Sequence, residues 1–140
     1  MKQSPSNLKF KKFHKPNSSF LFLNDNKTFY PLHGQYAIKS LESGKLTFKQ
    51  IEAVRRSLSR RLDKNSKLWI RVFTYASLSK KPIASRMGKG KGNHAVWVCP
   101  IRKGQILYEI GGLSEFFSLH ILKCASSKLP IKTTLVKNFF

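Results

Sequence analysis

Apolar residues recur along the chain at a spacing that predicts two helices. After Thr47, the apolar side chains of Ile51, Val54, Leu58 and Leu62 fall on one face of a helix. Thr47 and Gln50 are three residues apart, which is a capping box that satisfies free backbone donors at a helix start. We therefore predict that the first helix begins at this point.

A second helix is predicted from Ser114, as its N-cap, to about Lys128, because Pro130 prevents the helix from continuing. Its predicted buried face consists of Phe117, Ile121, Cys124 and Ala125. The pattern contains no apolar stretch of the length that spans a membrane.

Short apolar or alternating runs, bounded by turn residues, predict the strands. These runs cover residues 28–41, 68–73, 95–101, 105–110 and 131–136. Gly34 indicates a bulge or a close approach of two backbones in the first run. Residues 42–45 form a predicted turn, and residues 102–104 predict a hairpin between the third and fourth runs.

The predicted fold class is α+β, with an antiparallel sheet, two packed helices, a long basic glycine-rich loop and a basic N-terminal extension. In a chain of 140 residues we expect three parts. Residues 1–26 form the extension, residues 27–137 form a single α+β domain with a protruding loop at 77–93, and residues 138–140 form a short tail.

Charge points to a polyanionic partner. The chain has 27 Lys and Arg residues against 6 Asp and Glu residues, for a net charge of +21. The charge is also organised, because no acidic residue lies between Asp63 and Glu109. Nucleic acid is the usual partner of such a surface, and a merely soluble basic protein is the alternative.

Three segments carry the cations. On the first helix, the side chains opposite the apolar face or beside it are those of Lys49, Arg55, Arg56, Arg60 and Arg61. The extension alternates basic and aromatic residues, a pattern typical of an arm that follows an RNA backbone, although a solvated tail is the alternative. Its candidate RNA contacts are Lys9, Lys11, Lys12, His14 and Lys15. Arg71, Lys80 and Lys81 are further candidates near the long loop.

The long loop is the most specific feature of the sequence. Its candidate RNA-facing residues are Arg86, Met87, Gly88, Lys89, Gly90, Lys91, Gly92 and Asn93. Alternating glycines let a backbone approach RNA closely, and each intervening lysine can meet a phosphate. The spacing does not match a nucleotide-binding P-loop or a dinucleotide fingerprint.

Catalysis and metal binding find little support. The carboxylates are scattered, the four histidines lack metal-ligand spacing, and Cys99 and Cys124 do not form a CxxC pair. We expect both cysteines in the core, and we expect no catalytic residue, metal or cofactor.

Residues 86–93 resemble the signature of the large-subunit ribosomal protein sixteen family of bacterial and organellar type. Further segments match that family in order: 9–15, 46–47, 50–53, 55–56, 67–73, 81–82, 97–98, 107–109 and 128–134. The resemblance implies an α+β structural protein that binds large-subunit rRNA, supports late subunit assembly and positions A-site and P-site tRNA near the peptidyl-transferase centre. It also implies neighbouring large-subunit proteins as partners, with no small-molecule substrate and no membrane.

Two questions remain open at this point. Abundant Phe, Lys, Asn and Ser suggest an AT-rich gene, and the basic arm begins almost at Met1. We therefore expect a mitochondrial ribosome in the matrix and an organelle-encoded gene, with a plastid or a bacterial cytoplasm as alternatives. The alternative functions are a free RNA-binding or ribosome-assembly factor of the same fold and, more distantly, a phosphate-handling enzyme.

Overall fold

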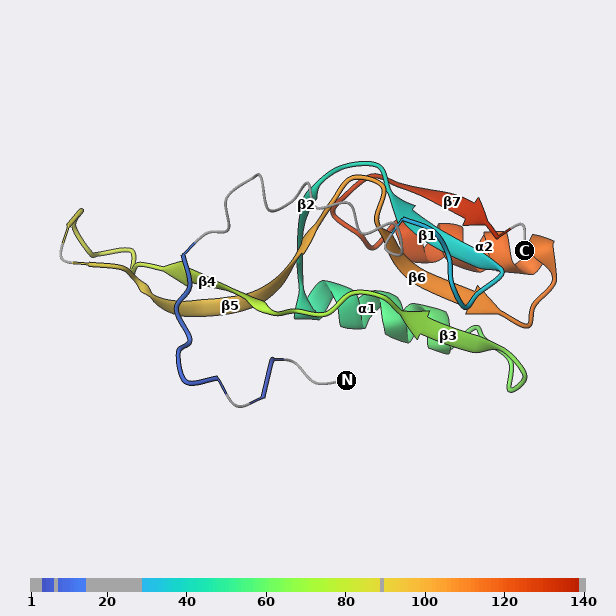
Figure 1. Cartoon of the computed structure of the whole chain (residues 1–140), viewed down its shortest axis with the longest axis horizontal. Coiled ribbons are helices and arrows are strands. Elements are labelled where there is room, and N and C mark those ends of the chain that lie inside the picture. The colour runs from blue at the N-terminus through green and yellow to red at the C-terminus, as the bar shows by residue number, and fades with distance from the viewer. Residues whose placement is uncertain (1–3, 7, 15–28, 89, 139–140) are drawn as a thin grey trace.

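A computed structural model describes residues 4–6, 8–14, 29–88 and 90–138 (Figure 1). Its elements, in chain order, are β1 (Tyr36–Ser40), β2 (Gly44–Thr47), α1 (Phe48–Ser59), β3 (Lys67–Ile70), β4 (Ala76–Lys80), β5 (Asn93–Ile101), β6 (Ile106–Gly111), α2 (Glu115–Ser126) and β7 (Thr133–Lys137). Two helices and antiparallel strands confirm the predicted α+β class.

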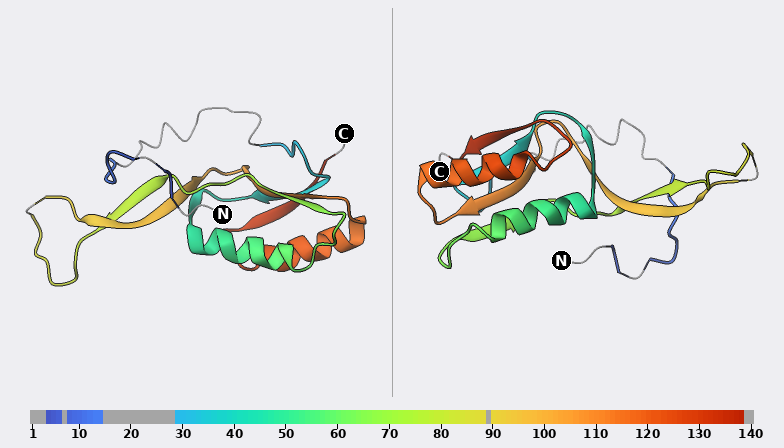
Figure 2. Two further views of the ribbon diagram at one scale, coloured as in Figure 1. Left: turned by 90° about the horizontal axis from the view of Figure 1, so that it is seen from below. Right: turned by 180° about the vertical axis from the view of Figure 1, so that it is seen from behind.

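The strands form two sheets instead of one. The larger sheet has the order β3-β6-β1-β7, and the smaller has the order β2-β5-β4. Helices α1 and α2 lie side by side on one face of the larger sheet (Figure 2). Strands β4 and β5 continue away from this body as a two-stranded ribbon (Figure 1). Neither helix in the described part of the chain is long and apolar enough to cross a membrane.

Helix α1 follows the sequence prediction closely. The Thr47 N–H donates to Gln50 Oε1 at 2.9 Å, and the Gln50 N–H donates to Thr47 Oγ1 at 3.4 Å, so the capping box is confirmed. The predicted Ile51, Val54 and Leu58 are buried in a core that includes residues of both sheets, whereas Leu62 lies beyond the end of α1 and is half-buried. There the hydroxyl of Tyr108 donates to the Ile51 carbonyl at 3.0 Å, which fixes the helix to β6.

Helix α2 buries a different face from the predicted one. Its buried residues are Ser118, Ile121, Leu122 and Ala125, whereas Phe117 is 40% exposed and Cys124 is half-buried. Ser118 can be buried because its hydroxyl donates to the Ser114 carbonyl at 2.8 Å, which satisfies the polar group. The small side chain allows the helix to pack closely, and the bulky Phe117 is turned outward.

The predicted hairpin between residues 95–101 and 105–110 is wrong. Residues 102–105 do form a tight turn, in which the Gln105 N–H donates to the Arg102 carbonyl at 3.2 Å. However, β5 pairs with β2 and β4, while β6 pairs with β1 and β3. All six residues of β6 are buried, and such a central strand needs a partner on each side.

Several predicted boundaries also shift. The predicted loop at 77–93 is too long, because β4 takes up residues 77–80 and β5 begins at Asn93. The strand predicted at 68–73 ends at Ile70. Strand β2 begins at Gly44, inside the predicted turn, and β7 covers Thr133–Lys137. The predicted close approach at Gly34 is confirmed, because a Cβ there would lie 2.7 Å from the Ile110 carbonyl oxygen.

A buried carboxylate joins the segment before β1 to the centre of the larger sheet. Glu109, with no exposed surface, accepts the backbone N–H groups of Leu32, His33 and Gly34 at 3.1, 2.7 and 2.9 Å. Arg71 completes the cluster with an ion pair. Burial by itself raises the pKa of the Glu109 carboxyl, but these hydrogen bonds outweigh it and hold the pKa below its ordinary value.

Candidate nucleic-acid interface

The glycine-rich loop is carried by the β4–β5 ribbon. Lys80 pairs with Asn93 and Ser79 pairs with His94, so residues 81–92 close the ribbon; we call them the finger. The finger lies at the end of the ribbon that is remote from the two helices (Figure 1). Arg86 and Met87 are exposed there, and the Met87 side chain is 96% exposed. The cations of the finger are therefore presented on a narrow projection.

Glycine has two different roles in the finger. Gly88 and Gly90 adopt φ angles of 97° and 86°, which disfavour any other residue, although a Cβ at either position would meet no atom within 4 Å. Gly92 is needed for space, because a Cβ there would lie 2.6 Å from the Lys80 carbonyl carbon. The Lys81 ammonium donates to the Gly88 carbonyl at 2.5 Å and so holds the two sides of the finger together.

Together these residues surround a concavity of about 570 Å³. It is lined by Lys81, Pro82, Ser85, Arg86, Met87, Gly88, Gly90, Lys91, Gly92 and Asn93. The lining includes every described residue of the predicted RNA-facing set at 86–93. Lys89 lies outside the described residues. A hollow formed by glycine backbone and cationic side chains can admit a segment of nucleic-acid backbone.

Residues 8–14, which we call the arm, cross the ribbon beside the finger (Figure 1). The Lys91 ammonium donates to the Phe13 carbonyl, and the Lys12 ammonium donates to the Lys91 carbonyl at 3.4 Å. The Phe13 ring meets the Trp97 ring edge-on, with 6.3 Å between centroids, and Trp97 also contacts His94 at 4.6 Å. Arm and finger therefore form one continuous basic surface.

The predicted cations of the arm lie on this surface. Lys9, Lys11, Lys12 and His14 are exposed. Lys15 lies outside the described residues. Lys80 is exposed at the end of β4, and Lys81 is half-buried at the base of the finger. The order of residues along the chain does not show that the arm and the loop touch, because Trp97 and His94, which join them, lie on β5.

Helix α1 carries a second cationic region. Arg55 holds Glu52 with two hydrogen bonds at 2.8 and 2.7 Å, and Arg56 contacts the same carboxylate at 3.1 Å. The hydrogen bond from Arg55 is the largest cause that lowers the pKa of Glu52 to about 2. Two guanidiniums thus share one carboxylate, which leaves a net positive charge. Lys49 is exposed on the same helix, and Arg60 and Arg61 are exposed just after its last residue.

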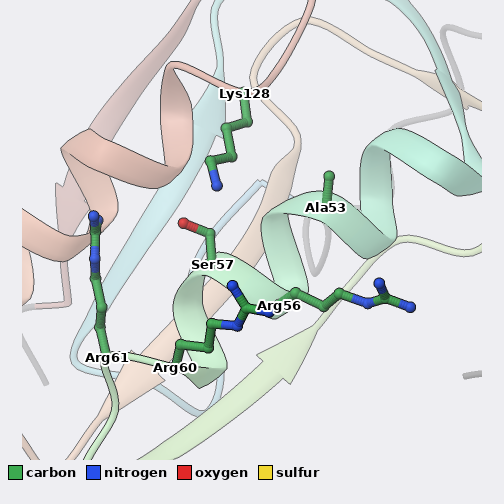
Figure 3. Close-up of a pocket in the computed structure, with 6 residues that line it drawn as sticks. All are labelled: Ala53, Arg56, Ser57, Arg60, Arg61 and Lys128. Carbon is green, nitrogen blue, oxygen red and sulfur yellow. The ribbon is translucent and has the colours of Figure 1, made fainter.

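Between the two helices lies a depression of about 400 Å³ (Figure 3). It is lined by Ala53, Arg56, Ser57, Arg60, Arg61 and Lys128. Lys128 follows the end of α2, so two helices supply the cations of this hollow. Neither Ser57 nor Lys128 was among the candidate site residues, since the helical pattern alone does not show which parts of two helices meet.

Arg71 stands apart from both regions. Its guanidinium pairs with the buried Glu109, and its side chain is 17% exposed. Although the sequence pattern grouped Arg71 with the RNA-binding cations, the structure gives it a role in holding the segment before β1 to the sheet.

The described residues contain no group of three or more His, Cys, Asp or Glu side chains that could hold a metal ion. Burial raises the pKa of the Cys99 thiol to about 11, which makes it a poor nucleophile at neutral pH. What the two regions can do chemically is bind anions with ammonium, guanidinium and backbone N–H groups.

Comparisons with known proteins agree with this picture. The family model described as "Ribosomal protein L16p/L10e" matches residues 5–136. A "Large ribosomal subunit protein uL16" of Blochmanniella pennsylvanica is 46% identical over 132 residues, covering 94% of this chain and 96% of the relative. Proteins with the same description from Buchnera aphidicola (49% identity; 94% of each chain) and Psychrobacter arcticus (44%; 95% of each chain) are similar along the same length.

Proposed function

The chain belongs to the ribosomal protein L16p/L10e family and is a structural constituent of the large ribosomal subunit, and from this premise we propose that it presents its finger to tRNA while its arm and α1 hold rRNA. It is not an enzyme. Its partners are rRNA and other ribosomal proteins, and the proposal adds A-site and P-site tRNA.

The observation that carries the proposal is the position of the finger at the far end of the ribbon (Figure 1). Helix α1 lies in the body of the molecule, so a narrow cationic projection can reach beyond rRNA that is held there to a second partner. Arg86 and Met87 are exposed near its tip, where a guanidinium can bridge phosphates or stack on a base. The contacts between Lys91, Lys12 and Phe13 support a preformed shape, which reduces the entropy lost on binding.

The arm and α1 would bind rRNA phosphates with little dependence on base identity, since lysine and arginine contacts to phosphate carry no direct sequence information. If six to eight phosphates are contacted, the logarithm of affinity should fall with the logarithm of salt concentration by a slope of about −4 to −7.

A test separates the two roles within assembled ribosomes. Subunits that carry Arg86→Ala should form in normal amounts but bind tRNA several-fold more weakly. Subunits from cells with Arg56→Ala and Arg60→Ala together should show the reverse, namely poor retention of the protein during sedimentation at high salt and normal tRNA affinity in those that assemble. Lys103→Ala, an exposed lysine of the 102–105 turn outside both regions, is the matched control. Equal assembly defects in both variants would contradict this division of roles.

The compartment is a separate proposal. The relatives named above are bacterial, which supports a bacterial ribosome. The Lys-, Asn- and Phe-rich composition is the support for a mitochondrial one. Cell fractionation followed by sedimentation of the tagged protein decides between them, because the protein co-sediments with the large subunit of its own compartment.

A further inference from the structure

The depression between α1 and α2 has the features of a discrete anion site. We propose that it binds a single phosphate group of rRNA, held by Arg60, Arg61 and Lys128 with the Ser57 hydroxyl as a further donor. The proposal rests on the proposed function and deepens it, because it names a chemical group and four residues for one contact.

The three cationic side chains of the site can bind an external anion. Within the described part of the chain, the side chains of Arg60, Arg61 and Lys128 make no ion pair or hydrogen bond with another residue. All three are exposed, so they can reach a ligand without unfolding either helix. Arg56 differs, because its guanidinium contacts Glu52 at 3.1 Å, and Figure 3 shows it directed away from the other cations.

The polar floor of the depression is also suited to an anion. Ser57 is only 8% exposed, and it lies on the face of α1 that meets α2. In Figure 3 its hydroxyl and the Lys128 ammonium point toward the same space, while the long Arg61 side chain rises from the end of α1 toward α2. A hydroxyl and an ammonium that face one space, with two exposed guanidinium side chains on the lining, give an anion donors from both helix ends.

The last carbonyl groups of α2 do not bind these cations. The last carbonyls of a helix carry a partial negative charge and often bind a lysine or arginine. Here the carbonyls of Lys123 and Cys124 accept the hydroxyls of Ser126 and Ser127 at 2.8 and 3.0 Å. The Ala125 and Ser126 carbonyls accept backbone N–H groups at 3.1 and 3.0 Å. Because these four carbonyls are satisfied locally, Lys128 is left for an external anion.

Salt dependence can test whether the cations share one phosphate. Affinity for a large-subunit rRNA transcript is measured against salt concentration for Arg60→Ala, Arg61→Ala, Lys128→Ala and the triple variant. The logarithm of affinity falls as the logarithm of salt concentration rises. Loss of one phosphate contact lowers the magnitude of that slope by about 0.7 to 0.9. We expect each single variant to weaken binding and the triple variant to lower the slope by about this same amount, since the residues act on one group. In the double variant Lys11→Ala/Arg60→Ala, which affects the arm and the depression, the two losses of affinity should add.

Nuclear magnetic resonance with inorganic phosphate identifies the site directly. Titration of the labelled full chain should shift the resonances of Ser57, Arg60 and Arg61, and the triple variant should lose these shifts while keeping the wild-type melting temperature. Phosphate shifts without any effect of the triple variant on the RNA slope would mean a site for free phosphate and would overturn the assignment to rRNA.

Two other outcomes also contradict the proposal. A slope change in the triple variant about three times that of one contact would mean that each cation meets its own phosphate. An unchanged slope in the triple variant, with a steep wild-type response, would mean that this depression does not touch RNA phosphate. A flat wild-type response would overturn the proposed function itself, so the two failures can be told apart.

Discussion

Arg71, just beyond the end of β3, pairs with Glu109 at the centre of β6, and the glutamate has no exposed surface. The same carboxylate binds three consecutive backbone N–H groups ahead of β1. One buried charge therefore connects three parts of the larger sheet. A lone buried carboxylate would destabilise the fold, but this one is surrounded by donors that compensate for its lost hydration.

Replacement of Glu109 by Gln should strongly destabilise the protein. The amide cannot neutralise Arg71, and its NH₂ group cannot accept the hydrogen bonds that the carboxylate accepts. We expect the free energy of unfolding to fall by about 3 kcal/mol, as measured by urea denaturation. Glu115→Gln is the matched control, because Glu115 is 54% exposed in its pair with Lys137 and should change stability little. Equal losses in the two variants would contradict a special role for Glu109.

Stability should also depend on pH through Glu109. Its pKa in the folded protein lies below the ordinary value of 4.5, so the folded state favours the charged form. The resulting stabilisation is fully present above that ordinary value and is lost as the pH falls through the lower pKa of the folded state. Urea denaturation from about pH 7 to about pH 3 should show this loss in the wild type and a smaller loss in Glu109→Gln. Parallel curves for the two proteins would contradict the prediction.

The arm should detach when its aromatic contact with the ribbon is removed. Phe13→Ala deletes the ring that meets Trp97 at 6.3 Å. We expect faster trypsin cleavage after Lys11 and Lys12 and faster hydrogen exchange in the arm, without a change in melting temperature. Phe10→Ala is the control, since the Phe10 ring is 67% exposed and should not hold the arm in place. If both variants are cleaved at the wild-type rate, the arm is not held by Phe13.

The two thiols should differ in reactivity. Cys99 is 3% exposed, and burial raises its pKa to about 11. Cys124 is half-buried, near the His120 ring on α2. Iodoacetamide at about pH 8 should therefore label Cys124 in the native protein and Cys99 after denaturation, because the thiolate is the reactive form. Native Cys124→Ser should then stay almost unlabelled, and rapid labelling of this variant would show that Cys99 is accessible.

Two glycine-to-alanine substitutions test the two roles of glycine in the finger, namely the positive φ at Gly88 and the lack of space at Gly92. Gly88→Ala introduces a side chain at a φ of 97° but into open space. We expect the melting temperature to be unchanged, because the finger is outside the core, and RNA affinity to fall several-fold as the strained backbone shifts. Gly92→Ala, with its Cβ 2.6 Å from Lys80, should instead disturb the β4–β5 pairing and increase hydrogen exchange along the ribbon. Identical exchange in the two variants would argue against separate roles.

Local interactions explain why parts of this fold were predictable. The capping box and the apolar face of α1 are set by residues within a few positions of each other, so periodicity identified both. Gly34 and the glycines of the finger also carried a clear signal, because few residues tolerate close approach or positive φ. The partners of β5 and β6 could not be predicted from the short turn between them, since pairing depends on strands far away in the sequence.

The sequence by itself determined the fold class, the first helix, the strongly basic character and the family resemblance, because these follow from composition, local periodicity and a contiguous glycine-lysine motif. The tertiary structure decided which distant groups meet. It paired Arg71 with Glu109, it placed Phe13 against Trp97, and it brought Lys128 close to the arginines at the end of α1. Such contacts are decided by the packing of whole elements, and charge or spacing along the chain does not specify them.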